Sequence, residues 1–273
     1  VTTIGTSAFE DCTALKNVTI PNSVTTIDES AFEGCAALSN ISFSDNSNLK
    51  IIGSHAFYNC KALRSISIPR STERIVGCSF LYCENLKTIT FDENAKLYHI
   101  GGCTFAGCKS LNNVVIPKNV GSIWERVFEG CSSLTDITFL GEITHIGWRA
   151  FSDCDKLISF TVPKTVQTID YGAFCSCDEL VEVVFEEGSK IETLSGNYQY
   201  QMFGSCKKLK RINIPNTVKV IEYAFEGCTS LDSIVIPNSV TTIGRNTFKD
   251  TGLKNVVIPN SVTTIGPLAF YGC

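Results

Sequence analysis

Fourteen cysteines and three histidines are the residues best suited to chemistry in this chain of 273 residues. Thiolates and imidazoles serve as nucleophiles and metal ligands, and two thiols can form a disulfide. Eleven of the cysteines recur at a nearly constant spacing, beginning with Cys12 and Cys35. Such regularity indicates a ladder of equivalent core positions. Zinc needs ligands that converge on one point, and the members of a ladder do not converge, so the spacing argues against a zinc site.

The spacing of the eleven regular cysteines favours free thiols over disulfides. Equivalent side chains in stacked parallel strands lie about 4.8 Å apart, whereas a disulfide needs Cβ atoms at about 3.8 Å with a suitable torsion. We therefore expect small, buried, apolar thiols. Cys78 and Cys103 lie outside the ladder at equivalent positions of successive repeats, which makes them the first candidates for a disulfide. Cys175 is expected to be free.

The remaining polar features give little support to a metal site or an active site. His55, His99 and His145 occupy different repeat positions, which favours surface or turn roles. The acidic connections 44–49, 92–97 and 186–191 lack EF-hand spacing, so solvated loops are the default and weak calcium binding is the alternative. The sequence contains no G-x-S-x-G, P-loop or H-E-x-x-H motif. We predict no enzyme activity, no cofactor and no metal.

A repeated unit must position all of these residues, and the phenylalanines give its period. Phe9, Cys12 and Leu15 lie on one face of a short helix or turn. Val18 and Ile20 alternate as in a strand, and a proline often follows. One such unit is too small to bury its apolar face, so copies must stack. The marker phenylalanines, 22 to 29 residues apart, are Phe9, Phe32, Phe57, Phe80, Phe105, Phe128, Phe151, Phe174, Phe203, Phe225, Phe248 and Phe270.

The repeated unit resembles a known family. The segment from Leu15 to Val24, L-x-x-V-x-I-x-x-S-V, is similar to the leucine-rich repeat. The fuller pattern I-G-x-x-A-F-x-x-C-x-x-L-x-x-V-x-I-P-N-S-V resembles the BspA-like subclass, with Pro-x-Ser where an asparagine ladder would lie. The resemblance implies an α/β solenoid of about twelve coils of 22–29 residues. A parallel sheet would form the concave face, with short helices or turns on the convex face.

The resemblance covers the whole chain, so we expect residues 1–273 to form a single leucine-rich repeat domain. The chain begins at Val1 inside one repeat and ends at Cys273 inside another. Neither end has the polar capping segment that solenoids need for solubility. These features indicate a fragment of a longer array.

Aromatic residues gather where other repeats carry glycine or small polar residues. Clustered exposed aromatic rings often mark an interaction site, so these residues are candidates for partner binding. The alternative is that the rings cover their own backbone or shield the long insertion between Glu186 and Met202. The candidates are Trp124, Trp148, Tyr171, Tyr198, Tyr200 and Tyr223.

Composition narrows the possible partners. The net charge is -4 and the pI about 5.5, which argues against nucleic acid as a partner. No apolar run of about 18 residues is present, which argues against membrane insertion. The resemblance implies a non-catalytic recognition or adhesion module of a cell-surface or secreted protein, which binds extracellular matrix proteins, cell-surface proteins or glycans. The alternative is a structural spacer or stalk.

Overall fold

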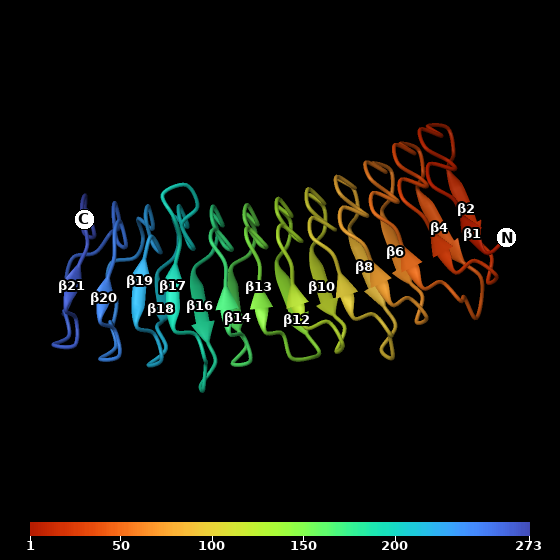
Figure 1. Cartoon of the computed structure of the whole chain (residues 1–273). Helices are drawn as coiled ribbons and strands as arrows, with labels where there is room; N and C mark the ends of the chain where they lie inside the picture. The colour runs from red at the N-terminus through yellow and green to blue at the C-terminus, as the bar shows by residue number, and fades with distance from the viewer. The chain divides into compact units, whose positions relative to one another are not determined.

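The computed structural model describes residues 1–273 and contains 21 short strands (Figure 1). The strands belong to a parallel β-solenoid with the leucine-rich repeat fold and about 11 turns. The chain divides into two compact units, residues 1–142 and residues 143–273. Most turns contribute a longer strand and a shorter one, so each unit carries two series of strands, and the last two turns of unit 2 contribute a short strand only.

Unit 1 contains strands β1 to β12. The longer strands are β2 (Asn17–Ile20), β4 (Asn40–Phe43), β6 (Ser65–Ile68), β8 (Thr88–Phe91), β10 (Asn113–Ile116) and β12 (Asp136–Phe139). The shorter strands are β1 (Thr3–Ile4), β3 (Thr26–Ile27), β5 (Ile51–Ile52), β7 (Arg74–Ile75), β9 (His99–Ile100) and β11 (Ser122–Ile123). Strands β1, β3, β5, β7 and β9 form one parallel sheet, while the longer strands form the sheets β2–β4 and β6–β8–β10–β12.

Unit 2 continues the same scheme. The longer strands are β14 (Ser159–Val162), β16 (Glu182–Phe185) and β18 (Arg211–Asn213), which pair in that order. The shorter strands are β13 (His145–Ile146), β15 (Thr168–Ile169), β17 (Thr193–Ser195), β19 (Val220–Glu222), β20 (Thr242–Ile243) and β21 (Thr264–Ile265). Strands β17, β19, β20 and β21 form a second parallel sheet.

The prediction of short helices, and with it the α/β class, is wrong: the segments before each longer strand are successive tight turns. Ser7 and Asp11 have positive φ angles of 55° and 54°, which interrupt any helical run. The amide of Phe9 donates to the carbonyl of Ala31 in the next coil at 2.8 Å, so it cannot join an intrahelical ladder. The apolar spacing at i, i+1, i+4 and i+7 arises instead from two consecutive turns that face the core.

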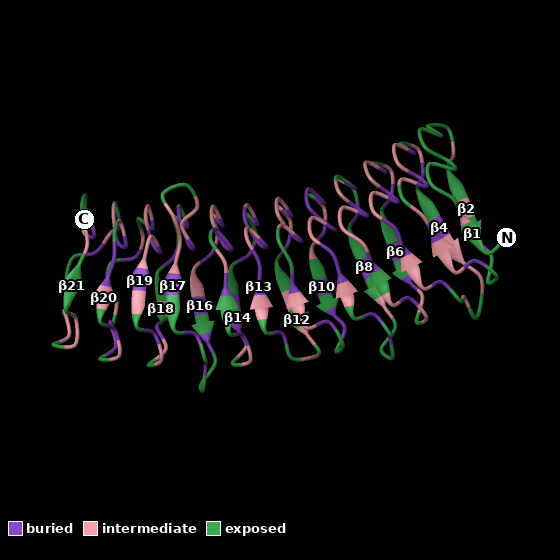
Figure 2. Cartoon of the chain, in the orientation of Figure 1, coloured by how far each residue is buried: buried purple, intermediate pink, exposed green.

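Stacked phenylalanines form the centre of each unit. Figure 2 colours the buried segments of each coil purple. Phe32 and Phe57 are fully buried, and their ring centroids lie 5.3 Å apart with planes within 5°. Equivalent pairs repeat along both units, for example Phe203 and Phe225 at 5.6 Å. Registered parallel strands place each apolar residue over its counterpart, as Val18 lies over Ile41. Each ring is therefore sandwiched between two others, except at the end of a stack.

All fourteen cysteines are free thiols. The ladder cysteines have a hydrogen-bonding role that their spacing alone did not reveal. The Sγ of Cys60 donates to the carbonyl of Phe32 at 3.1 Å, and the Sγ of Cys83 donates to that of Phe57 at 3.1 Å. Burial raises the pKa of Cys83 to about 12, which keeps the donor protonated. The same bond is made by Cys35, Cys108, Cys131, Cys177, Cys206, Cys228 and Cys273.

In several coils the residue two places after the proline forms a second ladder, which replaces an asparagine ladder. The hydroxyl of Ser71 donates to the carbonyl of Leu49 in the preceding coil at 2.8 Å. Thr165 bonds in the same way to Ile143 at 2.7 Å. These side chains satisfy backbone carbonyls at the turns, where the strand ladders have ended. The Pro-x-Ser segment is thus a structural element of the stack.

Candidate binding surfaces

Two of the predicted aromatic residues in unit 2 pack against each other. The rings of Trp148 and Tyr200 meet edge to face, with centroids 5.4 Å apart. The guanidinium of Arg149 lies 5.2 Å from the centroid of Tyr200, in cation–π geometry. Arg149 also donates to the carboxylate of Asp153 at 3.0 Å. This group joins Tyr200, which belongs to the long insertion, to the coil that carries Trp148 and Arg149.

The backbone of the insertion forms a turn that is closed by its own hydrogen bonds. The Asn197 side-chain oxygen accepts from the amides of Gln199 at 2.9 Å and Tyr200 at 2.8 Å. Gly172 has a positive φ of 64°, and a Cβ on it would lie 3.1 Å from the Cβ of Tyr200. The missing side chain at residue 172 therefore makes room for Tyr200 to pack.

The other predicted aromatics differ in exposure and position. Tyr198, within the insertion, is 80% exposed, and Tyr171 is 47% exposed. Tyr223 is half-buried, and its carbonyl accepts from the amide of Met202 at 3.2 Å. Trp124 is exposed in unit 1, where its ring centroid lies 6.2 Å from that of His99. Among the predicted aromatic residues of unit 2, Tyr171 and Tyr198 are thus the most accessible to a partner.

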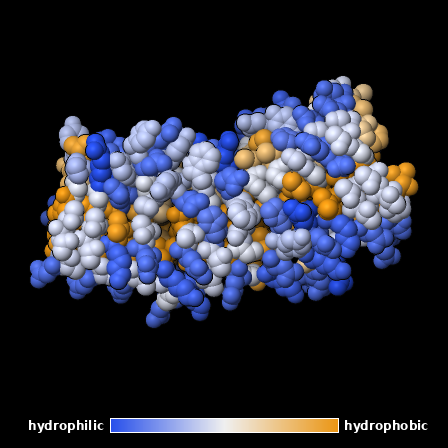
Figure 3. All heavy atoms as spheres, viewed as in Figure 1, coloured by the Kyte–Doolittle hydropathy of each residue, from blue (hydrophilic) through white to orange (hydrophobic).

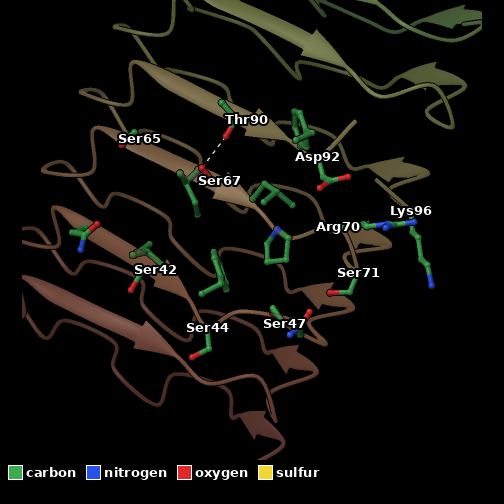
Figure 4. A pocket seen from close by; sticks show the side chains of 18 residues that line it. Ser42, Ser44, Ser47, Ser65, Ser67, Arg70, Ser71, Thr90, Asp92 and Lys96 are labelled. Atoms are coloured by element: carbon green, nitrogen blue, oxygen red, sulfur yellow. Dashed lines mark hydrogen bonds between the residues drawn. The ribbon is translucent and has the colours of Figure 1, made fainter. Parts of the chain in front are cut away.

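Unit 1 carries a groove of about 980 Å³ between β4 and β6 (Figure 4). These adjacent longer strands belong to different sheets, since β4 pairs with β2 and β6 pairs with β8. In Figure 4, Ser42 and Ser44 lie on one side of the groove, with Ser65 and Ser67 on the other. The lining residues are Asn40, Ile41, Ser42, Phe43, Ser44, Asn46, Ser47, Ser65, Ile66, Ser67, Ile68, Pro69, Arg70, Ser71, Thr90, Phe91, Asp92 and Lys96.

The end of unit 1 that carries the N-terminus exposes hydrophobic surface (Figure 3, orange). Phe9 is 38% exposed there and stacks on Phe32, with centroids 5.0 Å apart. A hollow of about 320 Å³ at this end is lined by Phe9, Ile4 and Pro21 among others. This surface is a part of the stacked core that is left uncovered, and it has no convergent polar groups.

The titratable side chains do not assemble into a metal-binding group. No three of the histidines, cysteines, aspartates and glutamates lie together in a way that could hold a metal ion. His145 contacts Asp170 at 3.4 Å, and His55 shares a hydrogen bond of 2.9 Å with Ser54. Desolvation, assisted by the charge of Arg74, lowers the pKa of His99. No helix of the structure has the length and apolar character of a membrane span.

The groove between β4 and β6 was not predicted from the sequence. Its sequence signal is the connection 44–49, where coil 2 lacks the proline turn and has additional residues before Leu49. That signal indicates an irregular loop, but it does not indicate that two neighbouring strands fail to pair. The groove of unit 1 presents hydroxyl groups, and the region around Tyr171 and Tyr198 in unit 2 presents aromatic rings. Both kinds of group suit reversible contact.

Comparison with known proteins identifies the family to which the chain belongs. The family described as BspA type leucine-rich repeat region, with 6 copies, matches residues 2–110, 94–200 and 196–273. The chain therefore belongs to this family, as its repeat pattern predicted. The family and the fold are those of repeat modules that are generally non-catalytic. No curated protein is significantly similar to the chain.

Solved structures of bacterial leucine-rich repeat proteins share the fold. A leucine-rich repeat protein from Bacteroides ovatus is 27% identical, with a TM-score of 0.71, over 100% of this chain and 80% of that one. The Treponema pallidum leucine-rich repeat protein TpLRR is 32% identical, with a TM-score of 0.53, over 57% of this chain and 72% of that one. The pneumococcal vaccine antigen PcpA is 19% identical, with a TM-score of 0.60, over 97% of this chain and 79% of that one.

Proposed function

We propose that the chain is a non-catalytic recognition or adhesion module of a cell-surface or secreted protein, which binds a protein or glycan partner through the solenoid surface. The observation that carries the proposal is the exposure of Tyr171 and Tyr198 in unit 2, close to the hydrogen-bonded turn at Asn197. Tyrosine provides a large amphipathic contact area with few rotatable bonds, and it is enriched among the residues that dominate binding energy.

The packing around the insertion supports this role. Trp148, Tyr200 and Arg149 hold each other in place, and Asn197 closes the turn that carries Tyr198. A preorganised loop loses less conformational entropy on binding than a mobile one. Thus the half-buried aromatics position the segment, and the exposed ones are available to the partner.

The family supports the proposed location. BspA-like proteins, which the repeats resemble, are cell-surface or secreted, and one protein of similar fold is a bacterial vaccine antigen. Binding to extracellular matrix proteins, cell-surface proteins or glycans would suit such a location. Contact across many similar coils would add avidity without a deep site.

Alanine substitution at the exposed tyrosines tests the proposal. The full chain is assayed by surface plasmon resonance against immobilised collagen, laminin, fibronectin and a glycan panel. For any partner found, Tyr171→Ala combined with Tyr198→Ala is expected to weaken binding about tenfold or more, because truncated anchor residues typically cost more than about 1.4 kcal/mol.

A matched control separates contact from folding. Tyr98, in unit 1, is 53% exposed, so Tyr98→Ala removes an equally accessible ring elsewhere and should leave binding unchanged. Thermal unfolding of the double variant should equal that of the parent. Failure to bind any probe would favour the spacer function, and an affinity unaltered by the double substitution would remove the aromatic surface from the proposal.

A further inference from the structure

The groove of unit 1 lies where the series of longer strands is interrupted. β2 pairs with β4 through four residues each, and β6 pairs with β8 in the same way, but no ladder joins β4 to β6. The resulting volume of about 980 Å³ lies at the upper end of the range of about 300–1,000 Å³ for small-molecule sites. The interruption therefore creates a hollow large enough for a ligand of several rings.

The coils that flank the groove remain joined to each other on the opposite side of the solenoid. β5 and β7 pair through Ile52 and Ile75, and Ser71 donates to Leu49 at 2.8 Å. An additional strand between β4 and β6 would require a separation of about 9.6 Å, twice the normal strand spacing. Because these bonds hold the coils together, a peptide strand is a poor fit. A ligand would instead lie across the surface of the groove.

Hydroxyl groups line the groove at matching positions of successive strands. Thr19 and Ser42 form a hydrogen bond of 2.9 Å on one side, and Thr90 donates to Ser67 at 2.9 Å on the other (Figure 4). No hydrogen bond crosses the groove from Ser42 to Ser67. Each hydroxyl can donate once and accept twice, so both retain capacity for a ligand. A ligand rich in hydroxyl groups could bridge the two serines and continue the row.

The groove has amphipathic walls with little net charge. Asn40, Asn46 and further serines add neutral donors and acceptors, while half-buried Phe43 and Phe91 provide apolar surface. The charged lining residues are Arg70, Lys96 and Asp92, which Figure 4 shows near one end. Their formal charges sum to +1, so a polyanion would gain only limited attraction. Sugar rings combine hydroxyl edges with apolar C–H faces, which matches such walls.

We propose that the groove between β4 and β6 binds an uncharged oligosaccharide, with sugar hydroxyls bridging Ser42 and Ser67. The pyranose faces would contact Phe43, Phe91 and Pro69. This site lies in unit 1 and does not use the tyrosines assigned above to partner binding in unit 2. It rests on the proposed function and deepens it by naming an uncharged glycan as a ligand of unit 1, and the groove and the tyrosine surface can each fail without the other.

Calorimetric titration of the full chain with defined hexasaccharides tests the site. The uncharged probes are the hexamers of β-1,4-glucose, α-1,4-glucose, N-acetylglucosamine and xylose, and the acidic probe is hexagalacturonate. At least one uncharged probe is expected to bind with a Kd of about 1 mM or tighter. Because few charges are involved, added salt should leave that Kd unchanged.

Variants locate the binding to the groove. Ser42→Ala combined with Ser67→Ala should weaken binding about tenfold, since each lost hydrogen bond contributes modestly. Ser67→Tyr should abolish binding by filling the groove. Thr161→Ala, at the equivalent strand position of β14, is the matched control and should have no effect. Thermal unfolding verifies that each variant is folded.

Three outcomes would overturn the assignment. Failure of every uncharged hexamer to bind would do so, as would binding confined to hexagalacturonate. An unchanged Kd in the folded Ser42→Ala, Ser67→Ala variant would show that any sugar binds elsewhere. None of these variants alters Tyr171 or Tyr198, so they distinguish a failure of the groove from a failure of the tyrosine surface.

Discussion

Thr72 is a polar exception at a repeat position that is otherwise apolar. Other coils place valine, leucine or isoleucine there, such as Val24 and Leu97. Thr72 is fully buried, and its hydroxyl has no hydrogen-bond partner. The neighbouring Ser71 is half-buried and donates to Leu49. Two adjacent hydroxyls thus have opposite effects on stability, because only one of them has an acceptor.

Replacing Thr72 by valine should stabilise unit 1. The substitution keeps the β-branched shape and removes an unsatisfied buried hydroxyl, so we expect the free energy of unfolding to rise by about 1 kcal/mol. Urea denaturation followed by circular dichroism measures the change. Ser71→Ala is the matched comparison and should lower stability by a similar amount. A midpoint for Thr72→Val at or below that of the parent would contradict this reasoning.

At the scale of the elements, the turn segment and the strands of a coil are stabilised by the neighbouring coils of the stack. The segment around Phe57 makes its hydrogen bonds with the neighbouring coils, as the amide of Phe57 donates to Ser79 at 2.8 Å. Its ring stacks on Phe32 at 5.3 Å and on Phe80 at 5.2 Å. Each coil therefore depends on its nearest neighbours, as in other solenoids.

Replacing a phenylalanine of the stack by alanine should lower the free energy of unfolding more in the middle of the stack than at an end. Phe57→Ala is expected to lower the free energy of unfolding by about 3–5 kcal/mol, because it leaves a cavity between two rings. Phe9→Ala should cost clearly less, since Phe9 is 38% exposed and stacks on one ring only. Urea unfolding of both variants provides the comparison. Equal losses would show that the end coil is packed as tightly as the interior.

At the scale of the whole molecule, the thiol ladder couples the stability of both units to pH. The ladder thiols are protonated donors to carbonyls, and burial raises the pKa values of Cys60, Cys108, Cys177 and Cys228. For Cys83 the pKa rises from the unperturbed 9.0 to about 12. In the unfolded chain these thiols would ionise near their unperturbed value.

The sign of the coupling predicts alkaline unfolding. Below pH about 9 both states hold the thiol protons, so this contribution to stability is constant. Between pH about 9 and about 12 the unfolded chain binds fewer protons than the folded chain, so stability falls as pH rises. We expect the melting temperature, measured with a reductant present, to drop steeply in this window.

A single substitution isolates the thiol contribution from other groups that titrate at high pH. Thr251 occupies the cysteine position in one coil, and its hydroxyl donates to Phe248 at 2.8 Å, so threonine is tolerated there. Cys131→Thr should reduce the pH slope of the unfolding free energy by about 1.4 kcal/mol per pH unit within the window. A melting temperature that stays flat from pH about 9 to about 11 would rule out the coupling.

The sequence by itself determined the repeat, the family, the inward positions and the free state of the ladder cysteines. These follow from spacing, because a side chain that recurs once per coil must stack on its own copies. Spacing could not distinguish a helix from consecutive turns around Phe9 and Cys12, since both place the same residues on one face. Hydrogen bonds to the next coil, made only in the folded stack, decided in favour of turns.

The tertiary structure also decided which surface residues are accessible. Trp148 and Tyr200 look equivalent to Tyr198 in the sequence, yet they pack against each other while Tyr198 is exposed. The groove beside Ser42 and Ser67 depends on two strands that do not pair, although both fit the repeat pattern. Local pattern specifies which residues face the core, whereas contacts between coils specify where the stack departs from regularity.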